Sequence, residues 1–482
     1  MTEMHKQALE SIYRQVLQRL VNAQGEGQRL AMLRLAEHIS HRFPELAKAR
    51  LVVLCSGERD GLLALALLRG VQLLLAEARN QTFRLKVVIP ALPGSTPVDD
   101  GNIERVMATL FLLEDPRVDV LGVSDTGLFP YERMMVSQGR GRQGFAVLPI
   151  TLGGAPYASS QPRDVCLLAS AHWLWSALEK GAPGDLWVTP QPKRFLLRQG
   201  LHARRLLRSA GALGIHERVP CPNWLPRLAG LYKGRASGGR LSVNVPMPLS
   251  VHEFLPPTHK RRWQLATECL GMHLDPFSVR HGLMGCEDAL LGAHLTALSA
   301  CYYQGDHYAA GLDAWLRPRL EQLRREGVPA RKLVALRTAC LGERAVANQE
   351  SRLRRHVEER YGMSEEQLCC VLFQPFSGAG TYLKLFLERC HPDQALREGA
   401  LRQALEGHAV AAEDVRWLQR ISGLALSALR RLYAQPARTP WAAQAGLPAL
   451  CSCKAHAAIC QPSTVLLAKA RQPSKAPACL SQ

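Results

Sequence analysis

Residues 85–123 read LKVVIPALPGSTPVDDGNIERVMATLFLLEDPRVDVLGV. The stretch begins with an apolar run of strand length, residues 85–91, and ends with a second such run, residues 118–123. A polar loop between them leads into a helical pattern over residues 102–114. This order predicts two parallel strands joined by a helix that packs on the sheet.

The same alternation continues on both sides of this stretch. Upstream, the apolar run 51–55 (LVVLC) precedes a helical pattern over residues 59–78. Downstream, residues 144–150 (GFAVLPI), 185–189 (DLWVT) and 241–245 (LSVNV) are further strand candidates. We therefore expect an α/β fold, with a mostly parallel sheet and flanking helices of the Rossmann-like kind.

Four segments are predicted from changes of pattern along the 482 residues. Residues 1–48 form an amphipathic N-terminal helical arm, and residues 49–258 form the nucleotide-binding-like α/β domain. Residues 259–435 form an all-helical domain. Residues 436–482, with recurrent proline, alanine and serine, form a disordered tail.

The composition bounds the class of protein. Hydrophobic residues make up 47% and charged residues 21%, the profile of a globular protein. The most apolar run, residues 62–75, is interrupted by Arg69 and Gln72 and falls short of the roughly 20 residues that span a bilayer. No signal-peptide pattern opens the chain, and its 14 cysteines form no paired CxxC motifs. We therefore predict a cytoplasmic protein with no transmembrane segment, reduced thiols and no metal site among its cysteines.

The chain is strongly basic, with 60 Lys and Arg against 41 Asp and Glu and a formal charge of +19. The electrostatic field of such a positive charge attracts anionic partners: nucleic acid, an acidic membrane surface or a phosphorylated ligand. Aromatic residues are only 6% and do not alternate with the basic runs. Stacking platforms for single-stranded nucleic acid are therefore not evident.

Residues 285–292 (GCEDALLG) place two adjacent carboxylates, Glu287 and Asp288, at the predicted start of a helix. Acids are favoured there by the helix dipole and by free backbone N–H groups, so an ordinary helix start is one interpretation. An adjacent acid also raises the proton affinity of a carboxylate, which suits a general base. Both interpretations remain open at this stage.

The motifs around this pair resemble GT-A fold glycosyltransferases, in particular the large inverting family often called family 2. The strand that ends in Pro90 and Ala91, the acidic Glu104 and the strand before Asp125 match the opening of that family. The run MGCEDALLGAHLTA, residues 284–297, is similar to its G-x-E-D-x-x-L-G-x-R-L segment. The order and spacing of these short motifs carry the resemblance.

The resemblance implies transfer of a sugar from a nucleotide-sugar donor to a hydroxyl acceptor. Strand ends near Pro90, Ala91 and Asp125 would hold the nucleotide. Asp288 would take the acceptor proton, with Glu287 beside it. In addition, His281 precedes Glu287 by six residues, so we expect it to help bind the acceptor or the leaving group.

One departure from the family concerns the metal. The family holds a divalent cation, Mg²⁺ or Mn²⁺, through a D-x-D motif at the end of its central strand. Here the strand over residues 186–189 runs into Pro-Gln-Pro and then Lys193 and Arg194, so the carboxylate pair is missing. The positively charged side chains of Lys193 and Arg194 would neutralise the donor diphosphate in place of the metal ion. The arginine of the last motif is also replaced, by His294.

Two glycine loops offer other interpretations. Residues 56–61 (SGERDG) follow a strand and resemble the S-G-G-x-D-S PP-loop of adenylating enzymes, but Glu58 would repel phosphate. A plain turn in which Ser56 or Asp60 caps the helix is the favoured alternative. Residues 139–144 (GRGRQG) have the form GxGxxG, but a strand-like run follows them where a dinucleotide site needs a helix.

A function of another class remains open. The α/β domain can be a degenerate, non-catalytic scaffold in a basic protein that binds nucleic acid or a partner protein. The missing D-x-D motif agrees with this alternative. Binding to nucleic acid would then depend steeply on salt concentration.

Overall fold

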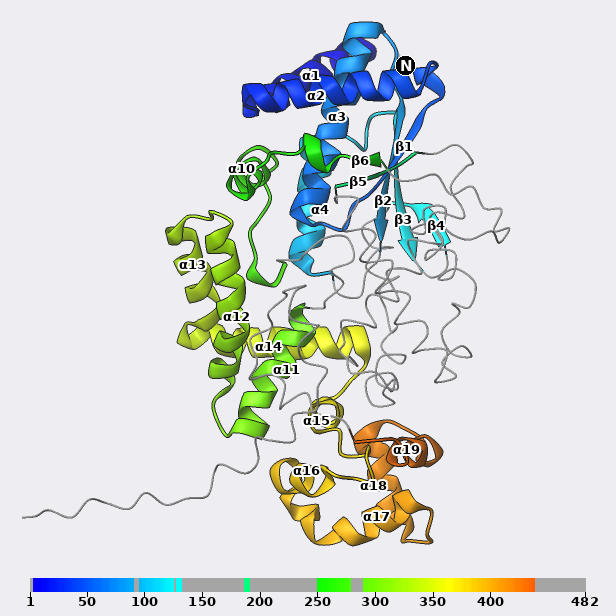
Figure 1. The fold of residues 1–482 in the computed structure, drawn as a ribbon, viewed down its shortest axis with the longest axis vertical. Helices are drawn as coiled ribbons and strands as arrows, with labels where there is room; N and C mark the ends of the chain where they lie inside the picture. The colour runs from blue at the N-terminus through cyan, green and yellow to red at the C-terminus, as the bar shows by residue number, and fades with distance from the viewer. Residues whose placement is uncertain are drawn as a thin grey trace, which may run out of the picture.

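The computed structural model describes residues 3–90, 95–124, 127–131, 186–190, 249–278 and 289–437. In this part of the chain a sheet with packed helices is followed by helices alone (Figure 1). The predicted α/β architecture is confirmed at this level. The strand candidates at 144–150 and 241–245, the loop 139–144 and the predicted tail beyond residue 437 lie outside the described residues.

The described sheet has the strand order β4-β3-β2-β1-β5-β6. The strands are β1 (Arg50–Leu54), β2 (Arg84–Pro90), β3 (Val118–Ser124), β4 (Gly127–Pro130), β5 (Leu186–Thr189) and β6 (Leu249–Ser250). Every neighbouring pair is parallel except β3 and the edge strand β4, which are antiparallel. The central strand β1 is buried from Leu51 to Leu54, as expected for a parallel strand that is covered on both faces.

Two helices connect the first three strands. Helix α3 (Arg59–Arg79) joins β1 to β2, and α4 (Pro97–Thr109) belongs to the connection from β2 to β3. Right-handed crossovers place both helices on one face, where Figure 1 shows them beside the sheet. The N-terminal helices α1 (Glu3–Ala23) and α2 (Glu26–Arg42) pack against α3.

Helix α3 is the core helix of this half. Its residues 61–73 are all buried. Within the described residues it is the one helix long and apolar enough to cross a membrane by length and composition, and 78% of its most apolar window is buried inside the protein. A helix that is largely apolar and enclosed in this way is typical of the core of a large fold.

The two polar residues that interrupt the apolar run of α3 belong to a buried network. Arg69 donates hydrogen bonds to Asp115 Oδ2 and to Gln72 Oε1, both at 2.7 Å. Arg117 donates to both oxygens of the same carboxylate, at 2.9 and 2.7 Å. The ring of Tyr13 lies 5.3 Å from the Arg69 guanidinium and 4.5 Å from that of Arg117. The network therefore ties α1 and α3 to the turn before β3.

Helix α4 begins five residues earlier than the apolar periodicity predicts, at Pro97. Thr96 is its N-cap, and the Thr96 hydroxyl accepts a hydrogen bond from the Asp99 backbone N–H at 3.2 Å. Asp99 Oδ2 in turn accepts from the Thr96 N–H at 2.7 Å. This reciprocal capping, with proline at the first helical position, fixes the earlier start.

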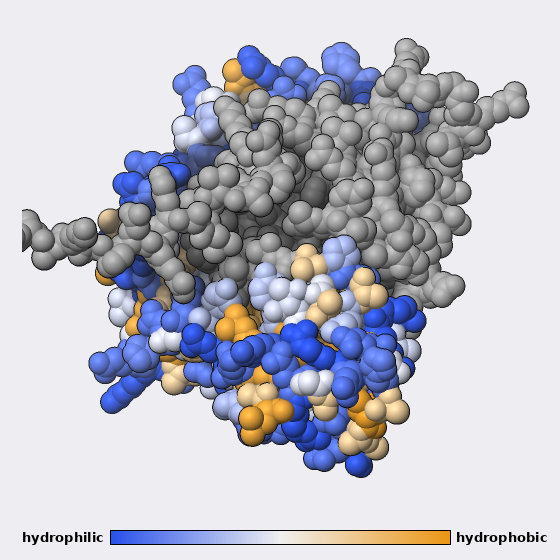
Figure 2. Space-filling model, turned by 60° about the horizontal axis from the view of Figure 1, so that its bottom comes forward, coloured by the Kyte–Doolittle hydropathy of each residue, from blue (hydrophilic) through white to orange (hydrophobic). Residues whose placement is uncertain are grey.

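The helical half begins after β6. Its helices are α10 (His259–Gln264), α11 (Ala289–Ser299), α12 (Tyr308–Arg325), α13 (Ala330–Leu341), α14 (Glu343–Tyr361), α15 (Glu365–Phe373), α16 (Leu383–Cys390), α17 (Glu398–Glu406), α18 (Ala412–Ser422) and α19 (Leu426–Tyr433). The buried apolar residues form two clusters, one between residues 16 and 272 and one between residues 277 and 433. Figure 2 views the lower end of the molecule in Figure 1, where apolar residues of the described chain lie in small groups among charged ones.

Helix α11 is the centre of the second cluster, because all eleven of its residues are buried. It packs antiparallel to α12. A Cβ on Gly292 would meet the Trp315 ring at 2.4 Å, and one on Gly311 would lie 2.6 Å from the Ala297 Cα. The two glycines therefore allow the close approach of the helices.

Replacing Gly311 by alanine should destabilise the protein by about 1–3 kcal/mol, because the new methyl group meets the α11 backbone, which cannot rotate away. Urea unfolding at equilibrium measures this change. Gly399→Ala in α17 is the matched control, since no heavy atom lies within 4 Å of its added Cβ. The control should be neutral or stabilising. Equal stabilities of the two variants would contradict the close approach.

Candidate functional site

In the described sheet, the side on which successive strands are added changes at β1. From β1 the chain proceeds to β2 and β3 on one side, whereas β5 and β6 add on the other side. β1 and β5 are therefore the neighbouring strands at which the strand order reverses. Ligands of open α/β sheets bind at such a switch point. The loops at this edge are thus the first place to look for function.

The loop after β1 crosses the centre of this edge. Ser56, Gly57 and Glu58 are all buried, and the Cys55 N–H donates to the Val88 carbonyl at 2.8 Å. Gly57 has φ +82°, a backbone conformation that favours glycine. Glu58 is the N-cap of α3, but its side chain makes no capping hydrogen bond. The expectation that Ser56 or Asp60 caps α3 is therefore wrong.

The start of α4 lies directly against this loop. A Cβ on Gly57 would come within 2.8 Å of the Asp99 Cβ and 2.9 Å of the Asp99 carbonyl oxygen. Ser95, Thr96, Asp99 and Asn102 are each at most 2% exposed. Buried polar side chains from two strand-to-helix connections are thus gathered at one edge of the sheet.

The ends of β5 and β6 lie on the other side of β1 at this edge. Thr189 and Ser250 end these strands, and both are buried. His252 Nδ1 donates to the Pro190 carbonyl at 3.1 Å, and since a carbonyl only accepts, this nitrogen carries the proton. The Val251 N–H donates to the Thr189 carbonyl at 2.9 Å. These bonds hold the two strand ends together.

The helical half reaches the same edge. In Figure 1 the arrows of β2 and β3 point toward it. Glu326, at the end of α12, pairs with Arg59, the first residue of α3, at 2.7 Å. Because α11 runs antiparallel to α12, its first residue, Ala289, lies at the end of the helical half that is nearer to the sheet.

The described residues include only one of the site residues predicted from the sequence. Pro90 ends β2 at the carboxyl edge, opposite Val123 of β3. The others, Ala91, Asp125, Lys193, Arg194, His281, Glu287 and Asp288, lie outside the described residues. Two of their chain neighbours are described: Ser124, which ends β3, and Ala289, which begins α11. The predicted roles of all eight residues stay predictions.

Burial and neighbouring charges set the protonation states of Cys55 and Asp60, at either end of the β1–α3 loop. Burial raises the pKa of the Cys55 thiol to about 12, so this group is not a thiolate nucleophile at neutral pH. Burial also raises the pKa of Asp60, but Arg59 and Arg262 outweigh burial and leave that pKa below its usual value. Asp60 is therefore an ionised carboxylate that is bound to two arginines.

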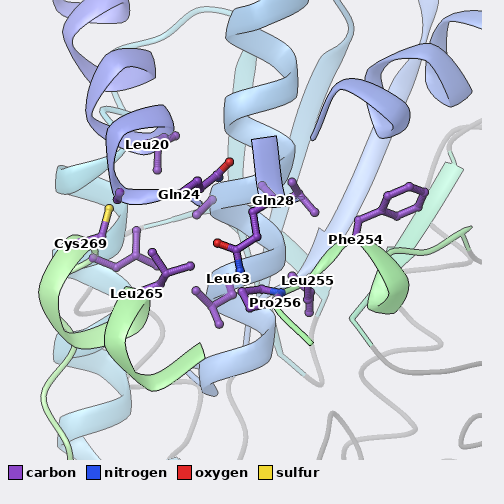
Figure 3. A pocket seen from close by; sticks show the side chains of 13 residues that line it. Leu20, Gln24, Gln28, Leu63, Phe254, Leu255, Pro256, Leu265 and Cys269 are labelled. Atoms are coloured by element: carbon purple, nitrogen blue, oxygen red, sulfur yellow. The ribbon is translucent and has the colours of Figure 1, made fainter. Parts of the chain in front are cut away.

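Two other hollows in the described residues are poorer candidates. Residues of α1, α2 and α3 and of the segment 254–270 line a mostly apolar pocket of about 30 Å³, which holds little more than a water molecule (Figure 3). A wider, open groove of about 590 Å³ lies between α1 and α10. Its two arginines, Arg19 and Arg261, donate to the carbonyl oxygens of Thr109 and Ala23. Neither hollow lies at the strand ends.

The sequence favours a plain turn for the loop after β1. A glycine after a buried strand and before a helix is also typical of a phosphate-binding turn. The motif departs from the PP-loop pattern at Glu58, and the periodicity of the chain does not say that β1 is the central strand. Thr96 and Asp99 also carried a signal, the capping pattern T-P-x-D, which marks a helix start.

Within the described residues, no three His, Cys, Asp or Glu side chains come together as a metal site. A divalent cation at this edge would therefore need ligands beyond the described side chains, such as phosphate oxygens and water. Comparisons of the chain with protein-family models, with curated proteins and with solved structures find no match.

Proposed function

We propose that the protein binds a nucleotide at the carboxyl edge of its parallel sheet, over the loop that joins β1 to α3. The observation that carries the proposal is the position of this loop: it leaves the central strand at the switch point and leads through Gly57, at φ +82°, into the N-terminus of a 21-residue helix. Free N–H groups at such a terminus favour a phosphate.

The reaction we propose is transfer of a sugar from a nucleotide-sugar donor to a hydroxyl acceptor. Its support is the resemblance to GT-A fold glycosyltransferases, together with the adjacent parallel pairing of β2 and β3, which carry the first of the matching motifs. The helix α11 that follows Glu287 and Asp288 begins at the end of the helical half that is nearer to the strand ends. In this proposal Asp288 is the base and Glu287 positions it.

A second chemistry is favoured by the strand order. The loop 56–61 resembles the PP-loop of adenylating enzymes, and it follows the central strand rather than an edge strand. Adenylyl transfer from ATP is therefore the alternative reaction at the same site. Glu58 and Asp99 bring negative charge to this loop, so we expect the phosphates of either nucleotide to bind together with Mg²⁺ or Mn²⁺.

A thermal-shift screen tests the proposal. UDP-glucose, GDP-mannose and ATP are each added with and without Mg²⁺ or Mn²⁺. A ligand at 100 times its Kd stabilises the folded state by about 2.7 kcal/mol, which raises Tm by a few degrees. A shift with a nucleotide sugar supports glycosyl transfer, and a shift with ATP alone supports adenylyl transfer. No shift with any of them would contradict nucleotide binding.

Turnover of Asp288→Asn tests the proposed base. If a nucleotide sugar is the donor, the variant should bind it normally and lose most of the transfer rate, about 100-fold or more. Full turnover would contradict the role of Asp288. The non-catalytic scaffold would instead be favoured by two results together. The protein would bind no nucleotide, and its binding to DNA or RNA would depend steeply on salt concentration.

A further inference from the structure

A cluster of charged and aromatic side chains joins the start of α3 to the helical half. We call it the Arg59 junction and define it as Arg59, Asp60, Arg262, Trp263 and Glu326. The Arg59 guanidinium donates to Glu326 Oε2 at 2.7 Å and to Asp60 Oδ1 at 2.8 Å. It also lies 4.6 Å from the centre of the Trp263 ring. Arg262 donates to Asp60 Oδ2 at 2.7 Å.

Glu326 is the centre of the junction on the side of the helical half. Its Oε2 accepts from Trp263 Nε1 at 2.7 Å as well as from Arg59, and its Oε1 accepts from Gln322 at 2.9 Å. The side chains of Arg59 and Glu326 are only 11% and 13% exposed. Burial raises the pKa of Glu326, but Arg59, Gln322 and Trp263 together hold it below its usual value. The pair is thus a partly buried ionic contact between two halves of the chain.

The backbone beside the Arg59 junction also packs closely against α10. Gly327 follows Glu326 with φ +82°, and a Cβ there would lie 2.7 Å from the Lys260 Cβ of α10. The end of α12 therefore rests directly on α10. His259 at the start of α10 accepts from Arg59 Nη2 through Nδ1 at 2.9 Å.

Arg59 is also the residue at which the β1–α3 loop ends. Strand β1 ends at Leu54 and helix α3 begins at Arg59. The loop between these two regular elements therefore consists of residues 55–58 only. The first N–H groups of α3 belong to this turn, and they are the groups that would face a phosphate. A displacement of the Arg59 side chain would move them.

We propose that the Arg59 junction lets the helical half set the shape of the nucleotide-binding loop, with Arg59 and Glu326 as positioning residues. The inference rests on the proposed nucleotide binding at this loop. It adds that residues from α10 and α12, about 200 or more positions away in the sequence, control the affinity. Because coupling is reciprocal, a bound nucleotide must in turn tighten the junction.

The test compares two carboxylates of the same region. Glu326→Gln removes the charge from the junction, whereas Glu321→Gln removes the charge from an exposed pair with Arg324 on α12. Affinities for UDP, GDP and ATP, each with Mg²⁺, are measured by titration calorimetry on the full chain. For the nucleotide that binds the wild type, Glu326→Gln should lower the affinity about tenfold, since small displacements of binding groups cost this much or more. Glu321→Gln should bind as the wild type does.

A second variant and a second readout separate positioning from general destabilisation. Trp263→Phe keeps a ring beside Arg59 but removes the Nε1 donor to Glu326, so it should also weaken binding if Glu326→Gln does not fold. Hydrogen exchange of residues 322–327 in the wild type should slow when the nucleotide binds, which a merely structural contact does not require.

The outcomes distinguish the two proposals. A wild type that binds a nucleotide, with variants of equal affinity and no change in exchange at residues 322–327, would overturn the coupling and leave nucleotide binding intact. A wild type that binds none of the three nucleotides would overturn both. Weaker binding by Glu326→Gln and Trp263→Phe, with slower exchange in the wild type, establishes the coupling.

Discussion

Replacing Asp115 by asparagine should lower the free energy of unfolding by about 3–5 kcal/mol, the largest stability effect expected for this chain. The Asp115 carboxylate and the Arg69 guanidinium are both 0% exposed and lie 2.7 Å apart. The substitution would leave Arg69 charged in the core without its counter-ion. Arg117, which donates to the same carboxylate, would lose its partner as well. Urea unfolding followed by circular dichroism measures the loss.

Asp119→Asn is the matched control for this prediction. Asp119 also pairs with an arginine, Arg84, but at 3.2 Å and with both side chains more than a third exposed. Its replacement should cost less than about 1 kcal/mol. A loss at Asp115 no larger than the loss at Asp119 would contradict the buried network.

The Asp115 contribution should also depend on pH. Burial raises the pKa of this carboxyl, but the hydrogen bonds from Arg117 and the charge of Arg69 outweigh burial and leave the pKa lowered. A lowered folded pKa means that the contribution is fully present above the ordinary carboxyl pKa of about 4 and is lost as pH falls through the folded value. The stability difference between wild type and Asp115→Asn should therefore be constant near neutral pH and shrink in acid.

Replacing Gly57 by alanine should lower nucleotide affinity by more than tenfold, or about 1.4 kcal/mol. Alanine at φ +82° is strained by about 1–2 kcal/mol, and its methyl group would press on the Asp99 Cβ and carbonyl at less than 3 Å. Since Asp99 is fixed by its bonds to Thr96, the loop has to move instead. Titration calorimetry with the nucleotide found by the screen measures the loss.

Gly27→Ala is the control for the loop substitution. Gly27 lies in the first turn of α2, and no heavy atom lies within 4 Å of its added Cβ. The variant should bind the nucleotide as the wild type does and be up to about 1 kcal/mol more stable, because alanine favours the helix. Unchanged affinity in a folded Gly57→Ala protein would remove this loop from the site.

Apolar patterning was sufficient to predict the general architecture. The runs 51–55, 85–91 and 185–189 are short and apolar, and they form β1, β2 and β5. The order of the strands could not be predicted in the same way, because parallel strands with similar apolar runs carry no local mark of their neighbours. The central place of β1 depends on contacts between residues more than 100 positions apart, such as Val53 with Val188.

The predicted site residues stay predictions, because all of them except Pro90 lie outside the described residues. The sequence pointed to the strand ends, and Pro90 lies at that edge. It did not point to Arg59 or Glu326, because an arginine and a glutamate 267 positions apart resemble any other pair of surface charges until the fold brings them together. The central roles given to Asp288 and Glu287 rest on the resemblance alone, and turnover of their variants is the evidence that they need.

The central claim is that a nucleotide binds over the β1–α3 loop, and hydrogen exchange read by mass spectrometry tests it most directly. With the nucleotide selected by the thermal-shift screen, the account predicts slower exchange of the backbone amides of residues 56–60, at the N-terminus of α3. A nucleotide that binds and slows exchange elsewhere, while residues 56–60 exchange as they do in the free protein, would contradict the account.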